Sequence, residues 1–184
     1  MNDTQRPLRI CLVNWQDREN PQAGGAEIHL HEIFGRLAHL GHHVTLLCGG
    51  WPGCPPRVQL DGIDVLRVGT RQSFPFKARA YWRHNLAAQH FDVVVEDINK
   101  VPLFTPFWPN ARVVGLVPHL FGLTAFQELP APLAAAVWVA ERPMPWVYRG
   151  LPFQAISEST RDDLVQRGIR RDNVRVIFPG IDTT

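Results

Sequence analysis

Two adjacent glycines, Gly24 and Gly25, stand between an apolar run at about 8–14 and a helical pattern at about 25–40. Because glycine has no Cβ atom, a ligand can come close to the backbone there. The free N–H groups and the positive dipole end of a helix start also favour a phosphate. The pair therefore predicts a seat for a diphosphate. A tight strand-to-helix turn would use the same residues, and the glycines alone do not decide between the two.

Further polar residues follow two other apolar runs. His119 comes directly after the run at about 112–117, and the run at about 92–96 ends in four polar residues: Glu96, Asp97, Asn99 and Lys100. Open α/β sheets bind ligands at the carboxyl edge of their strands, so all five are candidate binding groups. The alternative for His119 is a solvated loop residue. The alternative for the acidic group is a strand end with a helix-capping Asp or Asn.

A basic segment without any Asp or Glu spans residues 71–91. Its cations alternate with aromatic residues, and they are Arg71, Lys77, Arg79 and Arg83. A basic, aromatic, amphipathic helix can lie on an anionic membrane surface. A solvated helix whose aromatic side chains pack on the sheet is the alternative.

Several familiar chemistries are excluded by missing patterns. The sequence has no GxGxxG, and no acidic residue follows the run at about 43–49, so a nicotinamide dinucleotide site is disfavoured. It has no GxxxxGK[ST], which removes the P-loop nucleotidases. His31-Glu32 is followed by Gly35 where a zinc-binding HExxH needs its second histidine, and the cysteines show no CxxC spacing. We therefore expect no metal and no cofactor.

The elements that would position these residues alternate along the chain. Apolar runs predict strands at about 8–14, 43–49, 63–68, 92–96, 112–117, 153–157 and 174–178. Helical spacing predicts helices at about 25–40, 76–90, 131–149 and 158–167, the third interrupted by Pro143 and Pro145. Residues 50–62 are interpreted as a turn-rich connection. This order predicts an α/β fold with a Rossmann-like parallel sheet of about seven strands and helices on both faces.

Length and composition agree with one globular core. The chain has 184 residues, of which 45% are hydrophobic and 20% charged, which excludes disorder. No apolar run approaches the roughly 20 residues that span a bilayer, and the first residues lack a secretory pattern, so we expect a cytoplasmic protein. A net charge of +2 is too small to indicate a nucleic-acid partner, and none is expected.

Five segments in a fixed order carry a family resemblance: NPQAGGAE, HLGHHVTLLC, VPHLFG, SEST and PGID. Together they resemble the N-terminal half of a retaining glycosyltransferase of the GT-B fold, family 4, over essentially the whole chain. The resemblance implies a Rossmann-like N-terminal domain at 1–178, the start of an interdomain linker at 179–184, and a donor-binding C-terminal domain that this sequence does not contain. An isolated acceptor-side domain is expected to show little or no activity.

The resemblance also implies roles for single residues. Gly24 and Gly25 match the glycine loop that approaches the donor diphosphate, and His119 matches the histidine near the donor sugar. Glu27 matches the acidic residue after the glycine loop, although a Glu in a first helical turn also simply suits the helix dipole. Ser157 and Thr160 match a Ser-x-x-Thr, although Ser159 with Asp162 also spells a helix-start box.

The implied reaction moves a sugar from a nucleotide-sugar donor to a glycan or lipid-linked acceptor, with retention and without a metal, as in polysaccharide biosynthesis. Glu96, Asp97, Asn99 and Lys100 become candidates for acceptor recognition, because carboxylate and amide groups match sugar hydroxyls. A lipid-linked acceptor would place the protein at the inner face of the cell membrane, with the basic segment as its contact. The competing interpretation is a Rossmann-like module that binds a membrane or a partner without catalysis.

Overall fold

The computed structural model describes residues 6–99, 101–108, 111–120, 139 and 142–180. The chain divides into two compact units. The first comprises residues 1–95 and 108–112, and the second comprises residues 96–107 and 113–184. Strand β5 (Val93–Asp97) begins in the first unit and ends in the second.

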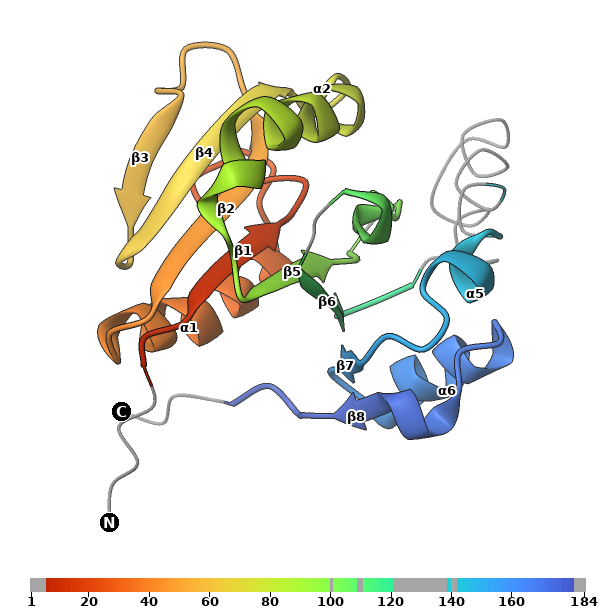
Figure 1. The fold of residues 1–184 in the computed structure, drawn as a ribbon. Coiled ribbons are helices and arrows are strands. Elements are labelled where there is room, and N and C mark those ends of the chain that lie inside the picture. The colour runs from red at the N-terminus through yellow and green to blue at the C-terminus, as the bar shows by residue number, and fades with distance from the viewer. Residues whose placement is uncertain (1–5, 100, 109–110, 121–138, 140–141, 181–184) are drawn as a thin grey trace. The chain divides into compact units, whose positions relative to one another are not determined.

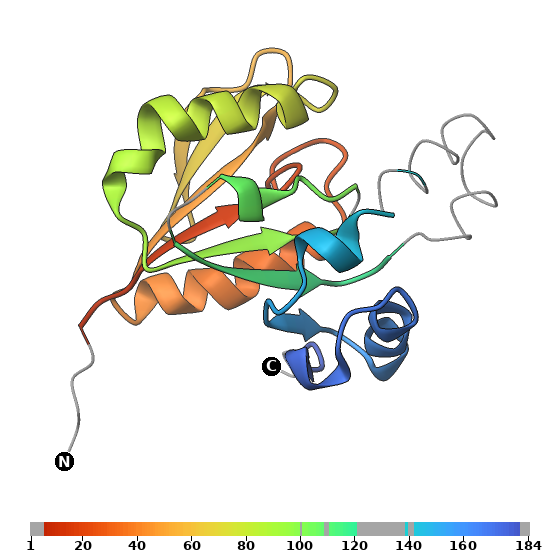
Figure 2. The same cartoon turned by 45° about the vertical axis from the view of Figure 1, so that its right-hand side comes forward.

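The first unit is a twisted sheet between two helices. Its strand order is β3-β4-β2-β1-β5, and β1 (Arg9–Val13), β2 (His43–Gly50) and β4 (Ile63–Thr70) run parallel. Figures 1 and 2 show helix α1 (Gly25–His39) on one face of these strands and helix α2 (Phe74–Tyr81) on the other. Such double coverage explains why β1 and β2 are apolar on both faces.

Helix α1 forms where the spacing of its apolar residues predicts it. Leu30 and Phe34 are buried on the face that packs on the sheet. Gly41 ends the helix in the left-handed region at φ 94°, which a residue without a Cβ atom adopts at little cost.

The sequence pattern predicts a turn-rich connection at 50–62, but the segment also contains a strand. It contains β3 (Arg57–Leu60), which pairs antiparallel with β4 at the sheet edge. The hairpin turn is Asp61-Gly62, and both residues have positive φ, 54° and 79°. An Asp-Gly pair between alternating residues is the usual signal of such a turn, so the strand could have been predicted.

The helix predicted at 76–90 is present but not uniform. After α2, with Pro75 in its first turn, the chain widens into a π-helical turn, η1 (Trp82–Leu86), and closes with a 3-10 turn, η2 (Ala87–Gln89). The extent of the helical segment is thus close to the prediction, whereas its change of geometry is not visible in the pattern of apolar residues.

The second unit continues from the end of β5 through the parallel strands β6 (Arg112–Val117), β7 (Phe153–Ala155) and β8 (Val174–Val176). Its remaining described elements are α5 (Met144–Val147), α6 (Glu158–Gln166), η3 (Thr105–Phe107) and η5 (Arg171–Asn173). Tyr148, Phe153 and Leu164 are among the residues of its core. Most of the helix predicted at 131–149 lies outside the described residues, and its described end starts at Met144 with Pro143 as N-cap.

The prediction of an α/β, Rossmann-like, mostly parallel sheet is confirmed, with eight strands among the described residues rather than about seven. None of the helices in the described ranges is long and apolar enough to cross a membrane.

Candidate functional site

The first unit presents the glycine loop at the carboxyl end of β1. The loop leaves β1 after Val13 and reaches α1 at Gly24, its N-cap residue. The Gly24 N–H donates to Glu27 Oε2 at 2.7 Å, so the buried Glu27 side chain caps the helix start and forms the Glu half of a capping box, whose other half Gly24 cannot supply because it has no side chain. Glu27 thus stabilises the helix start itself, and its contact with a donor stays a prediction.

Neither glycine is required by the packing of the chain. A Cβ atom on Gly25 would meet no heavy atom within 4 Å, and one on Gly24 would meet only Glu27 Oε2, at 3.8 Å. Both residues are exposed, and neither has a positive φ. A tight turn that needs glycine would show either a clash with an added Cβ atom or a positive φ, and neither is present here. The missing side chains therefore leave space beside the helix start. The first N–H groups of an α-helix have no partner within the helix and can bind an anion there.

The rest of the loop is rigidly held by hydrogen bonds. Asn14 Nδ2 donates to the Gln16 carbonyl at 2.9 Å, and Gln16 Nε2 donates to the Gln22 carbonyl at 2.7 Å. The Ala23 N–H donates to the Asn20 carbonyl at 2.8 Å. Asn14, Gln16 and Asn20 are buried although the segment is polar. Hydrogen-bonded burial of this kind orders a loop before any ligand arrives.

A buried ion pair anchors this loop to the sheet. Arg67 of β4 donates through Nε to Asp17 Oδ2 at 2.8 Å and through Nη2 to Asp17 Oδ1 at 3.0 Å. The same Nη2 reaches Glu19 Oε2 at 2.8 Å, and the guanidinium lies over the Trp51 ring, 4.4 Å from its centroid. The side chains of Arg67 and Asp17 are 1% and 0% exposed. The sequence pattern did not predict this pair. The one local sign of it is Arg67 itself, a charged residue inside the apolar run of β4.

The pair controls ionisation in its surroundings. Burial by itself would raise the pKa of Asp17, but the hydrogen bonds from Arg67 and the Glu19 N–H outweigh burial and leave this pKa below its usual range. The neighbouring Cys48 thiol lies 3.4 Å from Asp17 Oδ2, and burial together with that carboxylate raises its pKa well above normal. Cys48 is therefore a neutral, unreactive thiol.

Acid should destabilise the protein through Asp17. Because the pKa of Asp17 is lowered by folding, its stabilisation is complete above the unfolded value of about 3.9 and is lost as the pH falls through the folded value. We expect the free energy of unfolding, measured by urea denaturation between about pH 2.5 and pH 7, to fall less steeply in acid for Asp17→Asn than for wild type. Asp64→Asn, which removes a half-exposed carboxylate, should keep the wild-type slope. Equal slopes for Asp17→Asn and wild type would contradict the role of Asp17.

In the second unit, Glu96 lies at the end of β5 and is 0% exposed. Its carboxylate accepts hydrogen bonds from the Leu103 N–H at 2.6 Å, from the Thr105 N–H and hydroxyl at 3.0 and 2.5 Å, and from the Tyr148 hydroxyl at 2.8 Å. Burial raises the pKa of Glu96, and these hydrogen bonds partly offset that rise. The contacts hold residues 103–105 to the sheet, so an acceptor would reach Glu96 only if that segment moved.

The other predicted acceptor residues lie beside Glu96 in sequence. Asp97 and Asn99 are buried at the same strand end, and Lys100 lies outside the described residues. Contact of these residues with an acceptor stays a prediction.

His119 is exposed two residues after the end of β6, at the carboxyl edge of the sheet. Its loop is tied to helix α6, because the Thr160 hydroxyl donates to the Pro118 carbonyl at 3.4 Å. Ser157 is the N-cap of α6 and accepts a hydrogen bond from the Thr160 N–H at 3.1 Å. The helix-start box predicted for Ser159 and Asp162 is therefore wrong by two residues, since Ser159 already lies inside the first turn.

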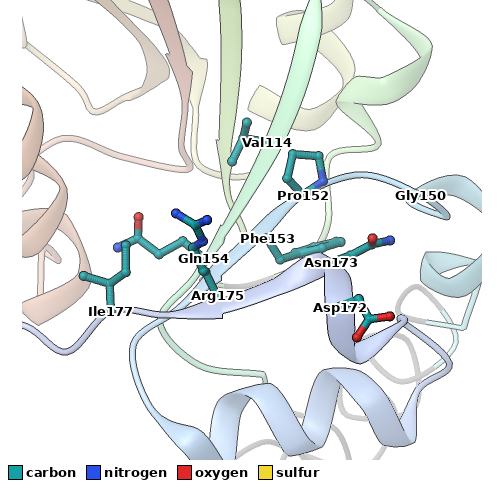
Figure 3. A pocket seen from close by; sticks show the side chains of 9 residues that line it. All are labelled: Val114, Gly150, Pro152, Phe153, Gln154, Asp172, Asn173, Arg175 and Ile177. Atoms are coloured by element: carbon teal, nitrogen blue, oxygen red, sulfur yellow. The ribbon is translucent and has the colours of Figure 1, made fainter.

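A cavity of about 470 Å³ also lies in the second unit (Figure 3). It is lined by Val114, Gly150, Pro152, Phe153, Gln154, Asp172, Asn173, Arg175 and Ile177. Pro152 and Asn173 precede β7 and β8, so the cavity extends toward the amino ends of these strands. Ligands of open α/β sheets bind beyond the carboxyl ends. The glycine loop in the first unit and His119 in the second unit, each taken by itself, therefore remain better candidates than this cavity.

Within the ranges that the structure describes, no three His, Cys, Asp or Glu side chains are grouped so that they could hold a metal ion. Besides the buried strand end with Glu96, Asp97 and Asn99, the structure brings predicted residues together in two groups. One is the helix start with Gly24, Gly25 and Glu27, and the other comprises Ser157 and Thr160 beside the His119 loop.

Comparison with known proteins adds a family and a fold. A family model described as Glycosyltransferase Family 4 matches residues 23–184, and comparison with curated proteins gives no match. Among solved structures, the chain is similar to HepE from Anabaena in complex with UDP and glucose (13% identity, TM-score 0.65), with UDP-glucose (15%, 0.58) and with UDP (14%, 0.59). These alignments cover 95% of this chain but only 44–45% of HepE. The chain therefore spans less than half the length of that protein, and at such identities the likeness shows the fold alone.

Proposed function

The chain belongs to glycosyltransferase family 4, and from that premise we propose that it is the acceptor-side domain of a retaining transferase. Such an enzyme moves a sugar from a nucleotide-sugar donor to a glycan or lipid-linked acceptor. The observation that carries this proposal is the bare helix start at Gly24 and Gly25, within a chain that matches the family almost throughout. HepE binds UDP and UDP-glucose, which supports a uridine diphosphate sugar as the first donor to test.

The glycine loop would bind the donor diphosphate. The N–H groups at the start of α1 and the positive end of its dipole suit the two phosphates, and neither glycine places a side chain in the way. The Arg67–Asp17 pair keeps the loop in this shape without contacting the donor. Binding of the diphosphate would also help it to leave, since the same groups stabilise the negative charge that develops as the bond to the sugar breaks.

His119 would contact the donor sugar. Its imidazole is exposed at the ligand edge of the sheet, and Thr160 holds the preceding carbonyl in place. An imidazole at that position can hydrogen-bond a sugar hydroxyl or support charge at the anomeric carbon.

Retention requires no protein nucleophile in this proposal. The acceptor hydroxyl attacks from the face that the diphosphate leaves, the new bond forms at the anomeric carbon, and a phosphate oxygen takes the hydroxyl proton. The chemistry then needs no metal and no cofactor from this chain. The part played by its residues is positioning and electrostatic stabilisation.

The domain would comprise residues 1–178, with residues 179–184 as the start of a linker and the donor-binding domain outside this chain. We propose a cytoplasmic enzyme that works at the inner face of the cell membrane when its acceptor is lipid-linked. Transfer would require both domains, so this chain alone would be inactive.

A donor-dependent assay on the full-length protein tests the proposal. UDP release from UDP-glucose and from related nucleotide sugars should be detectable, with or without a chelator. Alanine at His119 should lower kcat by about 100-fold or more, while the free energy of unfolding stays near wild type because the side chain is exposed. His43→Ala, at an exposed histidine on the amino end of β2, should keep full turnover.

Two outcomes would contradict the proposal at different points. Normal turnover in His119→Ala would remove the role of His119 but leave the transferase. No UDP release from any donor would favour a binding module without catalysis.

A further inference from the structure

The outer face of α2 and of the turn that follows it is basic and carries one exposed aromatic ring. We propose that this face, formed by Phe76, Lys77, Arg79 and Arg83, docks the protein on an anionic phospholipid surface. The inference goes beyond the proposed function and does not depend on it, since it rests on the burial and charge of this one helical segment.

The structure separates the aromatic residues of the segment into two classes. Phe74 and Trp82 lie in the core with Ala78 and Leu86, at four-residue intervals along the inner face, and the Trp82 ring lies 5.6 Å from that of Phe91. Phe76, by contrast, is 82% exposed. The alternative interpretation, in which the aromatic side chains pack on the sheet, is thus correct for Phe74 and Trp82. It does not account for Phe76, whose exposed ring has no packing role.

The cations around this ring are uncompensated. Lys77, Arg79 and Arg83 are all exposed, and among the described residues none of them forms an ion pair with a carboxylate. Arg83 Nη2 lies 3.4 Å from His84 Nε2, which is not an acidic partner. No Asp or Glu occurs between residues 71 and 91, and the next acid, Asp92, is already paired with Arg6. The face therefore has a local positive field although the whole chain carries only +2.

Helical spacing puts the ring, Arg79 and Arg83 on the same side, and Lys77, the residue after Phe76, lies on the flank of that side. Arg79 follows Phe76 by three residues and Arg83 by seven, and the exposed Ala80 lies between them at the fourth position. Long Lys and Arg side chains can reach the lipid phosphates while their stems cover apolar surface. A phenyl ring in the same face can enter the boundary between head groups and acyl chains. This combination favours a lipid surface over a duplex groove, because a phenyl ring offers no hydrogen bonds to base edges.

Arg71 has another partner and does not belong to the docking face. Its Nη1 donates to Gln22 Oε1 at 2.7 Å, and Gln22 is part of the glycine loop. Helix α2 begins just beyond the carboxyl end of β4, so the docking face starts at the ligand edge of the first unit. Docking would therefore hold the glycine loop close to the bilayer, where a lipid-linked acceptor is presented.

Co-sedimentation of the full-length protein with vesicles tests this inference. The protein should pellet with phosphatidylcholine vesicles that contain phosphatidylserine, but not with phosphatidylcholine alone. Binding should weaken strongly at about 0.5 M salt, where surface charges are screened. Each of Lys77→Ala, Arg79→Ala and Arg83→Ala should lower the partition coefficient about five-fold, and Phe76→Ala about ten-fold.

Matched controls exist in the same protein. Phe107→Ala removes another exposed ring, 62% exposed, and Arg57→Ala removes an exposed cation that is paired with Asp64. Both variants should bind vesicles like wild type. Unfolding curves should coincide for all variants, because every changed side chain is exposed.

Three results would overturn the inference. The first is failure of the wild-type protein to pellet with the anionic vesicles at low salt. The second is vesicle binding at the wild-type level by Phe76→Ala and also by each of the three cation variants. The third is displacement from the vesicles by a single-stranded oligonucleotide combined with no effect of Phe76→Ala, which would identify a nucleic-acid surface instead. Loss of sugar transfer with normal vesicle binding would bear only on the proposed function.

Discussion

Valine at position 25 should reduce sugar transfer by the full-length protein by at least about 100-fold in kcat/KM. The free energy of unfolding should stay within about 1 kcal/mol of wild type. A Cβ atom at Gly25 meets no protein atom within 4 Å, and the residue is the first of α1, so the fold accepts a side chain there. A diphosphate on the helix N-terminus needs the same space. The substitution therefore distinguishes a glycine that ligand binding requires from a glycine that folding requires.

A graded series makes the Gly25 result decisive. Gly25→Ala should show an intermediate loss of transfer and equal or greater stability, because alanine restricts the unfolded chain more than glycine does. Ile28→Val places a valine in the same turn at an exposed position and should transfer sugar normally. Affinity for UDP, measured by calorimetry, should fall in parallel with transfer across the series. Normal transfer by Gly25→Val would show that the glycine pair is only a strand-to-helix turn.

Methionine in place of Arg67 should lower the free energy of unfolding by about 3–5 kcal/mol, because it leaves Asp17 charged and buried without its partner. Arg67 makes two hydrogen bonds to Asp17 and one to Glu19, and the side chains of Arg67 and Asp17 are almost fully buried. Domains are stable by only about 5–15 kcal/mol. The single change therefore removes a large fraction of the total stability, and urea denaturation measures it directly.

Two further variants show that the loss comes from the unpaired charge. Arg57→Met removes an exposed arginine that pairs with Asp64 at 3.5 Å, and it should cost no more than about 1 kcal/mol. Combining Arg67→Met with Asp17→Leu should recover much of the lost stability, since replacing both partners of a buried pair by apolar residues is often neutral. A loss for Arg67→Met as small as that for Arg57→Met would rule out an anchoring role for the pair.

Much of the fold follows from local patterns along the sequence. All seven predicted strands are present, because a buried parallel strand needs an apolar run and the sequence marks each run by polar or glycine-rich flanks. The start of α1 was predictable for the same reason, since Gly24, Gly25 and Glu27 are neighbours in sequence and act within one helical turn. The family was also accessible, because its motifs are short segments in a fixed order.

Only the tertiary structure decided which groups meet across long separations. Asp17 and Arg67 are 50 residues apart and become partners because the loop after β1 lies against β4 in the folded sheet. Glu96 was a candidate for acceptor recognition because it ends a strand, yet Leu103, Thr105 and Tyr148 enclose it. Phe74 and Phe76 are both aromatic and two residues apart, but helical geometry sends one to the core and the other to solvent. Periodicity shows that an element has an inner and an outer face, whereas burial and pairing depend on what the rest of the chain places against each face.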